Sequence, residues 1–146
     1  MTGTTSTIKV ESRSINLSTR GNTDVVDITG EVISILDSSS VKNGTATLFV
    51  VGSTAALSTI EYEPGLVKDI DIALEKLAPR DGHYEHHLTW GDDNGNSHIR
   101  ATMMGPSLTV PITRGKMPLG TWQQIVLIDF DTRPRSREIV VQLMGN

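Results

Sequence analysis

The chain has 146 residues, a length that fits one domain with a hydrophobic core. It carries 13 basic and 17 acidic side chains, and the resulting net charge of −4 argues against a nucleic-acid-binding surface. No cysteine is present, which excludes disulfides, thiolate metal ligands and a cysteine nucleophile. Apolar runs fall far short of the ~20 residues that span a bilayer, and segment 1–7 is polar, so we expect a cytoplasmic protein that binds no membrane.

The first part of the chain predicts a strand, a helix and two more strands. Alternating residues from Ile8 to Leu17 indicate a hairpin or a bent strand. From Thr23 to Leu36, apolar residues recur at helical spacing after a capping residue, which predicts a helix. After the turn at Asn43-Gly44, a β-branched run predicts a buried strand over 45–51, followed by a strand over about 57–61.

The remaining elements complete a domain in which strands dominate. Pro64 opens an amphipathic helix that reaches Leu77, and a short helix is predicted over 97–104. Three β-rich segments follow, at 107–113, 121–130 and 138–144. No βαβ alternation persists and no linker is found, so we predict a single α+β domain over residues 1–146, built on an antiparallel sheet or sandwich with two main helices and one short helix.

The histidines are clustered, since all four lie between residues 83 and 98 together with Glu85, Asp92 and Asp93. Imidazole and carboxylate groups together can ligate a divalent metal or move protons near neutral pH. A helix over 84–90 would place His83, His86 and His87 on one face, whereas a strand would separate His86 from His87. Bracketing glycines and the Tyr, Thr and Trp residues favour the strand.

Within this cluster we favour His86 and His98 as the functional pair. The acidic loop between them supplies Asp92 or Asp93, either as a third metal ligand or as a partner that orients an imidazole. Two histidines, a carboxylate and an open position suit zinc, manganese or iron. The alternative is that both histidines are hydrogen-bonded structural residues. We expect His83 and His87 to be surface residues.

Three weaker candidates lie outside the cluster. Glu61 ends a predicted strand and either faces a cleft or caps the helix that begins at Pro64. Arg133, Arg135 and Arg137 can grip a phosphate bidentately or simply line a solvated hairpin. Trp122 lies in a β-rich run, which is typical of a core residue.

Six segments of the chain carry recognisable motifs: Ser107 to Gly115, Leu119 to Ile125, Thr54-Ala55-Ala56 with Glu61, Tyr84-Glu85-His86, Asp93-Asn94 with Ser97-His98, and Ser136-Arg137. Together they resemble the YjbQ-like family, whose members are named for a secondary thiamine-phosphate synthase activity. They follow the family's order over nearly the whole chain. The chain departs from many relatives at Gly52, where they carry histidine, and at Ile60, where they carry asparagine.

The resemblance implies a jelly-roll-like antiparallel sandwich that commonly forms a homotrimer, and it implies that His86 and His98 are the family's histidines. It also implies an enzyme that joins hydroxymethylpyrimidine diphosphate to a thiazole phosphate and releases diphosphate. In that reading Asp92, Asp93 and Asn94, with the two histidines, hold a divalent cation such as magnesium or zinc. Arg137 meets phosphate oxygens, and Glu61 accepts a proton or orients a ligand. A metal-dependent hydrolase or phosphatase, or a non-enzymatic binding trimer, are the alternatives.

Overall fold

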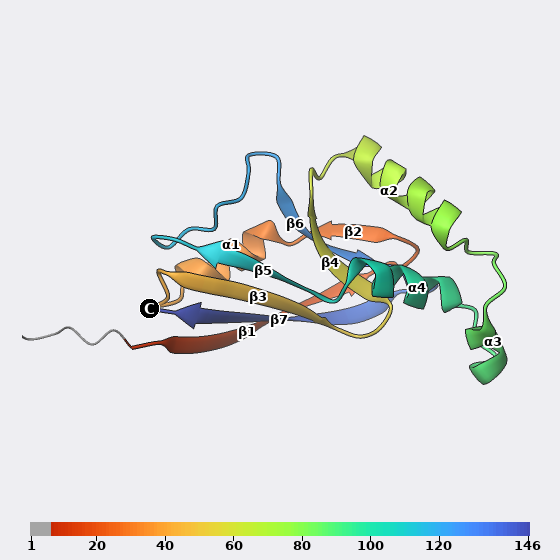
Figure 1. Cartoon of the computed structure of the whole chain (residues 1–146), viewed down its shortest axis with the longest axis horizontal. Helices are drawn as coiled ribbons and strands as arrows, with labels where there is room; N and C mark the ends of the chain where they lie inside the picture. The colour runs from red at the N-terminus through yellow and green to blue at the C-terminus, as the bar shows by residue number, and fades with distance from the viewer. Residues whose placement is uncertain (1–6) are drawn as a thin grey trace, which may run out of the picture.

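The computed structural model describes residues 7–146, which form two antiparallel sheets and four helices in one α+β domain (Figure 1). The larger sheet has the order β1 (Lys9–Thr19), β7 (Arg135–Gly145), β3 (Gly44–Val51), β5 (Ser107–Ile112). The smaller sheet has the order β2 (Asp24–Asp27), β6 (Gln124–Asp129), β4 (Ala55–Ile60). The helices are α1 (Thr29–Asp37), α2 (Pro64–Leu77), α3 (Glu85–Trp90) and α4 (Gly95–Met104). The expected α+β class is confirmed, whereas the jelly-roll detail stays a prediction.

The main core fills the space between the two sheets. Side chains of β3 and β7 alternate between buried and exposed, so each strand turns one face inward. Inward residues such as Leu48, Val141 and Leu127 are fully buried and pack with α1, which supplies Val32 and Leu36. Interdigitated apolar side chains of this kind hold two sheets together.

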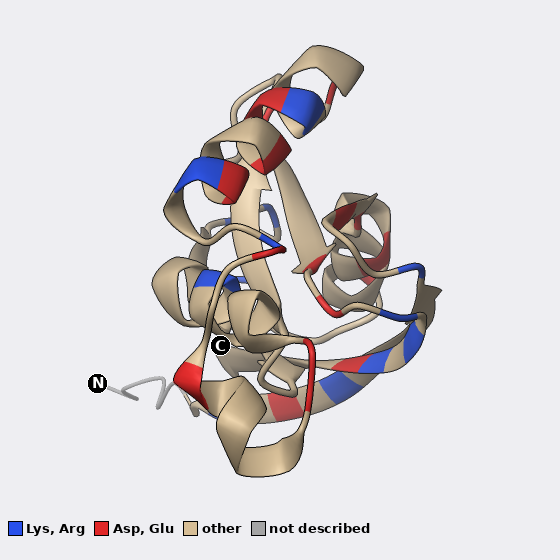
Figure 2. Ribbon diagram, turned by 90° about the vertical axis from the view of Figure 1, so that its right-hand side faces the viewer, with Lys and Arg blue, Asp and Glu red and all other residues tan. Residues whose placement is uncertain are grey.

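A second apolar cluster lies on the other face of the small sheet, where helices cover it. Val126 and Ile128 of β6 are buried against Leu74 of α2 and Ala101 of α4. Helix α2 begins as predicted, with Pro64 in its first turn and the Glu63 carboxylate accepting the N–H groups of Gly65 and Leu66 in that same turn. Acidic and basic residues are interleaved along this helix, which is the uppermost one in Figure 2. No helix within residues 7–146 has the length and apolar character needed to cross a bilayer.

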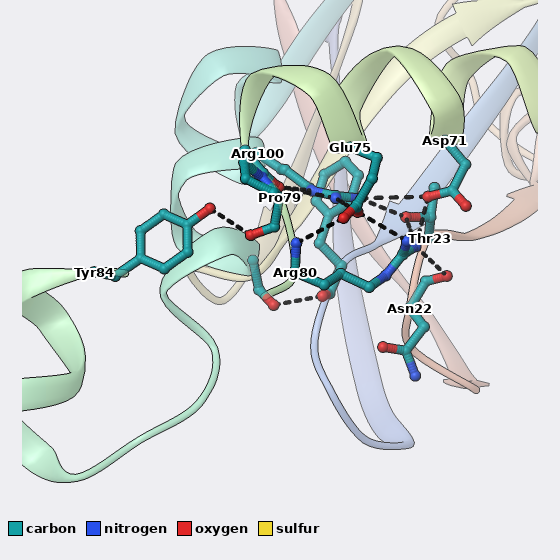
Figure 3. Close-up of polar contacts among 11 residues, drawn as sticks. Asn22, Thr23, Asp71, Glu75, Pro79, Arg80, Tyr84 and Arg100 are labelled. Atoms are coloured by element: carbon teal, nitrogen blue, oxygen red, sulfur yellow. Dashed lines mark hydrogen bonds and ion pairs between the residues drawn. The ribbon is translucent and has the colours of Figure 1, made fainter. Parts of the chain in front are cut away.

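Helix α4 is fastened to α2 by an arginine in the domain interior (Figure 3). Arg100 is 1% exposed and donates to Glu75, Asp71, Thr23 and the Ala78 carbonyl. Arg80 reaches the same two carboxylates from the solvent side. These two cations and two anions fix the helix that carries His98.

Four predictions are wrong in detail. The segment 23–36 is not one helix, because Val25 and Val26 pair with β6 and only α1 is helical. Segment 84–90 is helix α3 and not a strand, since Gly91 ends it in a left-handed conformation and no strand pairs with it. The expected three helices are therefore four. Trp122 is not a core residue but is 72% exposed, because it lies in the loop before β6.

Candidate functional site

His86 and His98 lie next to each other, on α3 and α4 respectively. Their ring centroids are 4.5 Å apart. The Nε2 atom of His86 is 3.2 Å from the Asn94 side-chain oxygen and 3.4 Å from an Asp92 carboxylate oxygen. The short loop between α3 and α4 therefore reverses the chain direction, and this brings both imidazoles close to Asp92 and Asn94 of the same loop.

The other two histidines differ from each other. His83 is on the surface as expected, 3.7 Å from Glu85. The surface prediction for His87 is wrong, because this half-buried ring accepts the Gly95 N–H at 3.0 Å and contacts Tyr84 edge-on. Its Nε2 thereby satisfies one of the free N–H groups at the start of α4. His87 is thus a structural residue that positions the helix bearing His98.

A cavity of about 340 Å³ opens beside His98. Its lining comes from the β3–β4 loop, the start of α4, the β6–β7 loop and the start of β7: Gly52, Ser53, Thr54, Asn94, His98, Asp131, Arg135, Ser136 and Arg137. Phe130 donates its N–H to the Thr54 carbonyl, which ties the β3–β4 loop to the end of β6. Residues separated by more than 80 positions in the sequence are in this way brought to one cavity.

Arg137 is held rigidly at the inner wall of this cavity. It is 8% exposed, and its Nε and Nη2 donate to the two oxygens of Asp129 at 2.6 and 2.9 Å. Nη2 also donates to the Thr54 hydroxyl at 2.6 Å. The two-point contact with a fully buried carboxylate fixes the plane of the guanidinium.

Arg135 stands at the outer wall and pairs with Asp131. Its Nε is 2.9 Å from an Asp131 oxygen, which also accepts the Thr54 hydroxyl. Burial raises the pKa of the Asp131 carboxyl, but hydrogen bonds from Arg135 and Thr54 outweigh it and hold that pKa below its ordinary value. Asp131 is therefore an anion already matched by its neighbours.

Two predicted residues do not join the site as expected. Glu61 is exposed at the far end of β4, roughly 20 Å along the strand from Thr54 at about 3.3 Å per residue. Asp93 accepts the Thr132 hydroxyl at 3.1 Å, and Asp92 is the carboxylate beside His86. Within residues 7–146 no three His, Asp or Glu side chains are arranged to hold a metal ion. The pair of imidazoles is thus present without a converged ligand set.

The sequence did not single out Asp129 and Asp131 as members of the site. Asp129 ends the apolar run of β6 and Asp131 follows two residues later, and a buried carboxylate of this kind needs a cation or hydrogen-bond donors as partners. Arg137 supplies the cation. This mismatch of an acid within an apolar strand is the signal that could have identified the ion pair.

The pH dependence of stability provides a test of the environment of His98. Burial, and then the adjacent His86, lower the pKa of His98 below its ordinary value of 6.5, although Asp131 opposes them. Below pH 6.5 the imidazole of His98 is protonated more readily in the unfolded chain than in the folded one. The stability that the neutral, partly buried His98 contributes above pH 6.5 is therefore lost as the pH falls. We expect the melting temperature of the wild type to fall faster than that of His98→Asn below this pH. Thermal melts followed by circular dichroism measure the melting temperature of both proteins at each pH.

His83→Asn is the matched control for this experiment, because His83 is exposed and its side chain has one polar contact among residues 7–146, with Glu85. Its melting curve should follow the wild type at every pH. If the wild type and His98→Asn lost stability in parallel, burial of His98 would have no part in the pH dependence.

Comparison with known proteins gives one consistent result. The profile of the family described as "UPF0047 protein YjbQ-like" matches residues 13–146. A UPF0047 protein of Methanothermobacter thermautotrophicus is 38% identical over 138 residues, covering 94% of each chain. The structure resembles a YbjQ-like protein of unknown function from Sulfolobus solfataricus, with TM-score 0.91, 36% identity and coverage of 96% of this chain and 100% of that one. A hypothetical protein from Aeropyrum pernix gives TM-score 0.86 at 32% identity, covering 93% and 99%. The chain therefore belongs to the YjbQ-like (UPF0047) family.

Proposed function

We propose that this protein is a cytoplasmic transferase resembling the secondary thiamine-phosphate synthases. It would join hydroxymethylpyrimidine diphosphate to a thiazole phosphate and release diphosphate. The observation that carries this proposal is one cavity in which the His98 imidazole and the Arg135 and Arg137 guanidinium groups meet. Guanidinium groups recognise phosphate oxygens, and imidazole donates or accepts protons near neutral pH.

In this reaction the thiazole nitrogen bonds to the methylene carbon of the pyrimidine as the bond from that carbon to the diphosphate oxygen breaks. Negative charge therefore grows on the leaving diphosphate. Fixed hydrogen-bond donors stabilise such charge most effectively when they need no rearrangement. Arg137 meets this condition, because Asp129 and Thr54 already fix its guanidinium. His86 and His98, on the adjacent helices, would hold or transfer a proton at the bound phosphate.

Metal binding is a separate part of the proposal. A divalent ion, zinc or magnesium, would use His86 and His98 with Asp92 or Asp93 of the intervening loop. The described residues do not converge on such an ion, since Asp93 is bonded to Thr132 and only Asp92 approaches His86. The chemical steps above are therefore assigned only to the protein's own side chains.

We also propose that three copies associate. The outer face of the four-stranded sheet exposes large apolar residues, among them Phe49, Val51 and Met144, which a neighbouring copy would cover. Light scattering of the purified protein would then give about three times the 15.8 kDa mass of one chain.

The synthase activity is tested by incubating the purified protein with both phosphorylated precursors and Mg²⁺ and quantifying thiamine phosphate. We expect product from the wild type, and a rate reduced by about 10²–10⁴-fold in His98→Ala, the range for losing a general acid or base. His83→Ala should retain the wild-type rate, because its side chain is exposed outside the cavity. Absence of product above the His98→Ala level would reject the synthase assignment. Release of phosphate from simple esters instead would favour a phosphatase.

A further inference from the structure

One nitrogen of the Arg137 guanidinium, Nη1, is not used by any group of the described residues. Nε and Nη2 are occupied by Asp129 and Thr54. Nη1 makes no hydrogen bond within residues 7–146, although the side chain is more than nine-tenths buried. Arg135 likewise uses only its Nε, on Asp131. The cavity wall thus carries guanidinium N–H groups that lack a protein acceptor.

The carboxylates beside these arginines are, in contrast, already supplied with donors. Each oxygen of Asp129 accepts two hydrogen bonds, from Arg137 together with Thr19 or the Asp131 N–H. Asp131 accepts from Thr54, Arg135 and Thr132. The unused hydrogen-bonding capacity around the two arginines consists of donors, so the complementary ligand is an acceptor. Oxyanions meet that requirement, and an ammonium group or a metal cation does not.

Because Gly52 has no side chain, a ligand in the cavity can reach the Nη1 atom of Arg137. A Cβ at this position would lie 2.7 Å from Nη1, a distance at which something must shift. The backbone φ of +128° is also one that only glycine adopts readily. Gly52 lines the cavity, so the absent side chain leaves space directly in front of the guanidinium.

We infer that the phosphoryl group of a phosphorylated metabolite binds between Arg135, Arg137 and the backbone at Gly52. This inference rests on the proposed function and specifies where its phosphorylated substrate is held. A phosphoryl group presents three terminal oxygens, which can meet Nη1 of Arg137 and the outer nitrogens of Arg135 together. His98, which lines the same cavity, would then face the bound group.

Inorganic phosphate is the probe that tests this subsite independently of any turnover. Calorimetric titration of the wild type should show saturable binding that equal ionic strength of chloride does not reproduce. Arg135→Gln should weaken it at least about tenfold, because charged hydrogen bonds are lost. Arg133→Gln is the matched control. It removes the same charge two residues before Arg135, but the Arg133 side chain does not line the cavity. This variant should bind phosphate within about twofold of the wild type.

Glycine variants test the role of the open space. Gly52→Ala should abolish phosphate binding, whereas Gly105→Ala, which also has a positive φ of +92° but nothing within 4 Å of its added Cβ, should retain it. Nitrogen NMR of the wild type gives a readout that requires no variant: phosphate should shift the guanidinium signals of Arg137 during titration. Unchanged Arg137 signals, or chloride binding equal to phosphate, would overturn the inference. Phosphate binding without thiamine phosphate formation would reject the synthase reaction and leave the subsite intact.

Discussion

Arg100→Met is expected to lower the free energy of unfolding by about 1–3 kcal/mol, the usual cost of leaving a buried polar group without its hydrogen bond. Arg100 is almost fully buried, and every N–H group of its guanidinium has an acceptor (Figure 3). Its loss would leave the buried Ala78 carbonyl without both of its Arg100 donors, whereas Asp71 and Glu75, 37% and 40% exposed, would keep their contacts with Arg80. Hydrogen bonds from Arg80 and Arg100 hold the pKa of Glu75 below its ordinary value although burial opposes them, so that carboxylate is charged at neutral pH.

Chemical denaturation of Arg100→Met and the wild type measures this loss, which corresponds to a melting temperature roughly 5 °C lower. Arg114→Met is the matched control, because Arg114 is exposed and its side chain makes no hydrogen bond or ion pair within residues 7–146. We expect that control to lie within about 0.5 kcal/mol of the wild type. A loss below 1 kcal/mol for Arg100→Met would contradict the anchoring role. Because α4 also carries His98, we expect the variant to lose phosphate binding together with stability.

Arg137→Met is expected to lower the free energy of unfolding further, by about 3–5 kcal/mol, because it leaves a fully buried carboxylate without its cation. The Asp129 side chain is 0% exposed, and Arg137 supplies two of its four hydrogen bonds. Removing the arginine leaves a buried carboxylate that only Thr19 and one backbone N–H contact. Such a group either stays charged at a high cost in free energy or takes up a proton.

The double variant Asp129→Leu/Arg137→Met separates the ion pair from the phosphate subsite. Replacing both members of a buried pair by apolar residues is often neutral, so the double variant should recover much of the stability that the single variant loses. It should not recover phosphate binding, because Nη1 is still absent. Denaturation and phosphate titration of both variants give the two readouts. A double variant less stable than Arg137→Met would show that the cost does not come from the unpaired Asp129.

The elements that could be predicted from sequence are those whose pattern is local and long. Helix α2 begins at Pro64 and ends at Leu77 as predicted, because the apolar spacing extends over fourteen residues and Glu63 with Pro64 marks its start. Strands β3, β5 and β7 were likewise indicated by β-branched runs between turns. The family resemblance added the selection of His86 and His98, which the structure places side by side.

Other elements depended on partners far away in the chain. Strand β2 has only four residues, and Val25 is held in a strand by Ile128 of β6, about a hundred residues later. Helix α3 is six residues long, too short for a periodic pattern to distinguish it from a strand. His87 became structural only because the chain returns to place the Gly95 N–H against it.

The sequence by itself therefore determined the fold class and the family, and it selected His86 and His98 as candidates, since local periodicity and motif order are properties of neighbouring residues. Only the tertiary structure decided what surrounds them. It joined Thr54, Asp129 and Arg137 into one buried network, because the start of β4, the end of β6 and the start of β7 lie near one another. It also separated Glu61 from that network by the length of β4. Ion pairs between distant strands leave no periodic signal along the chain, which is why the wall of the cavity could not be predicted from the sequence.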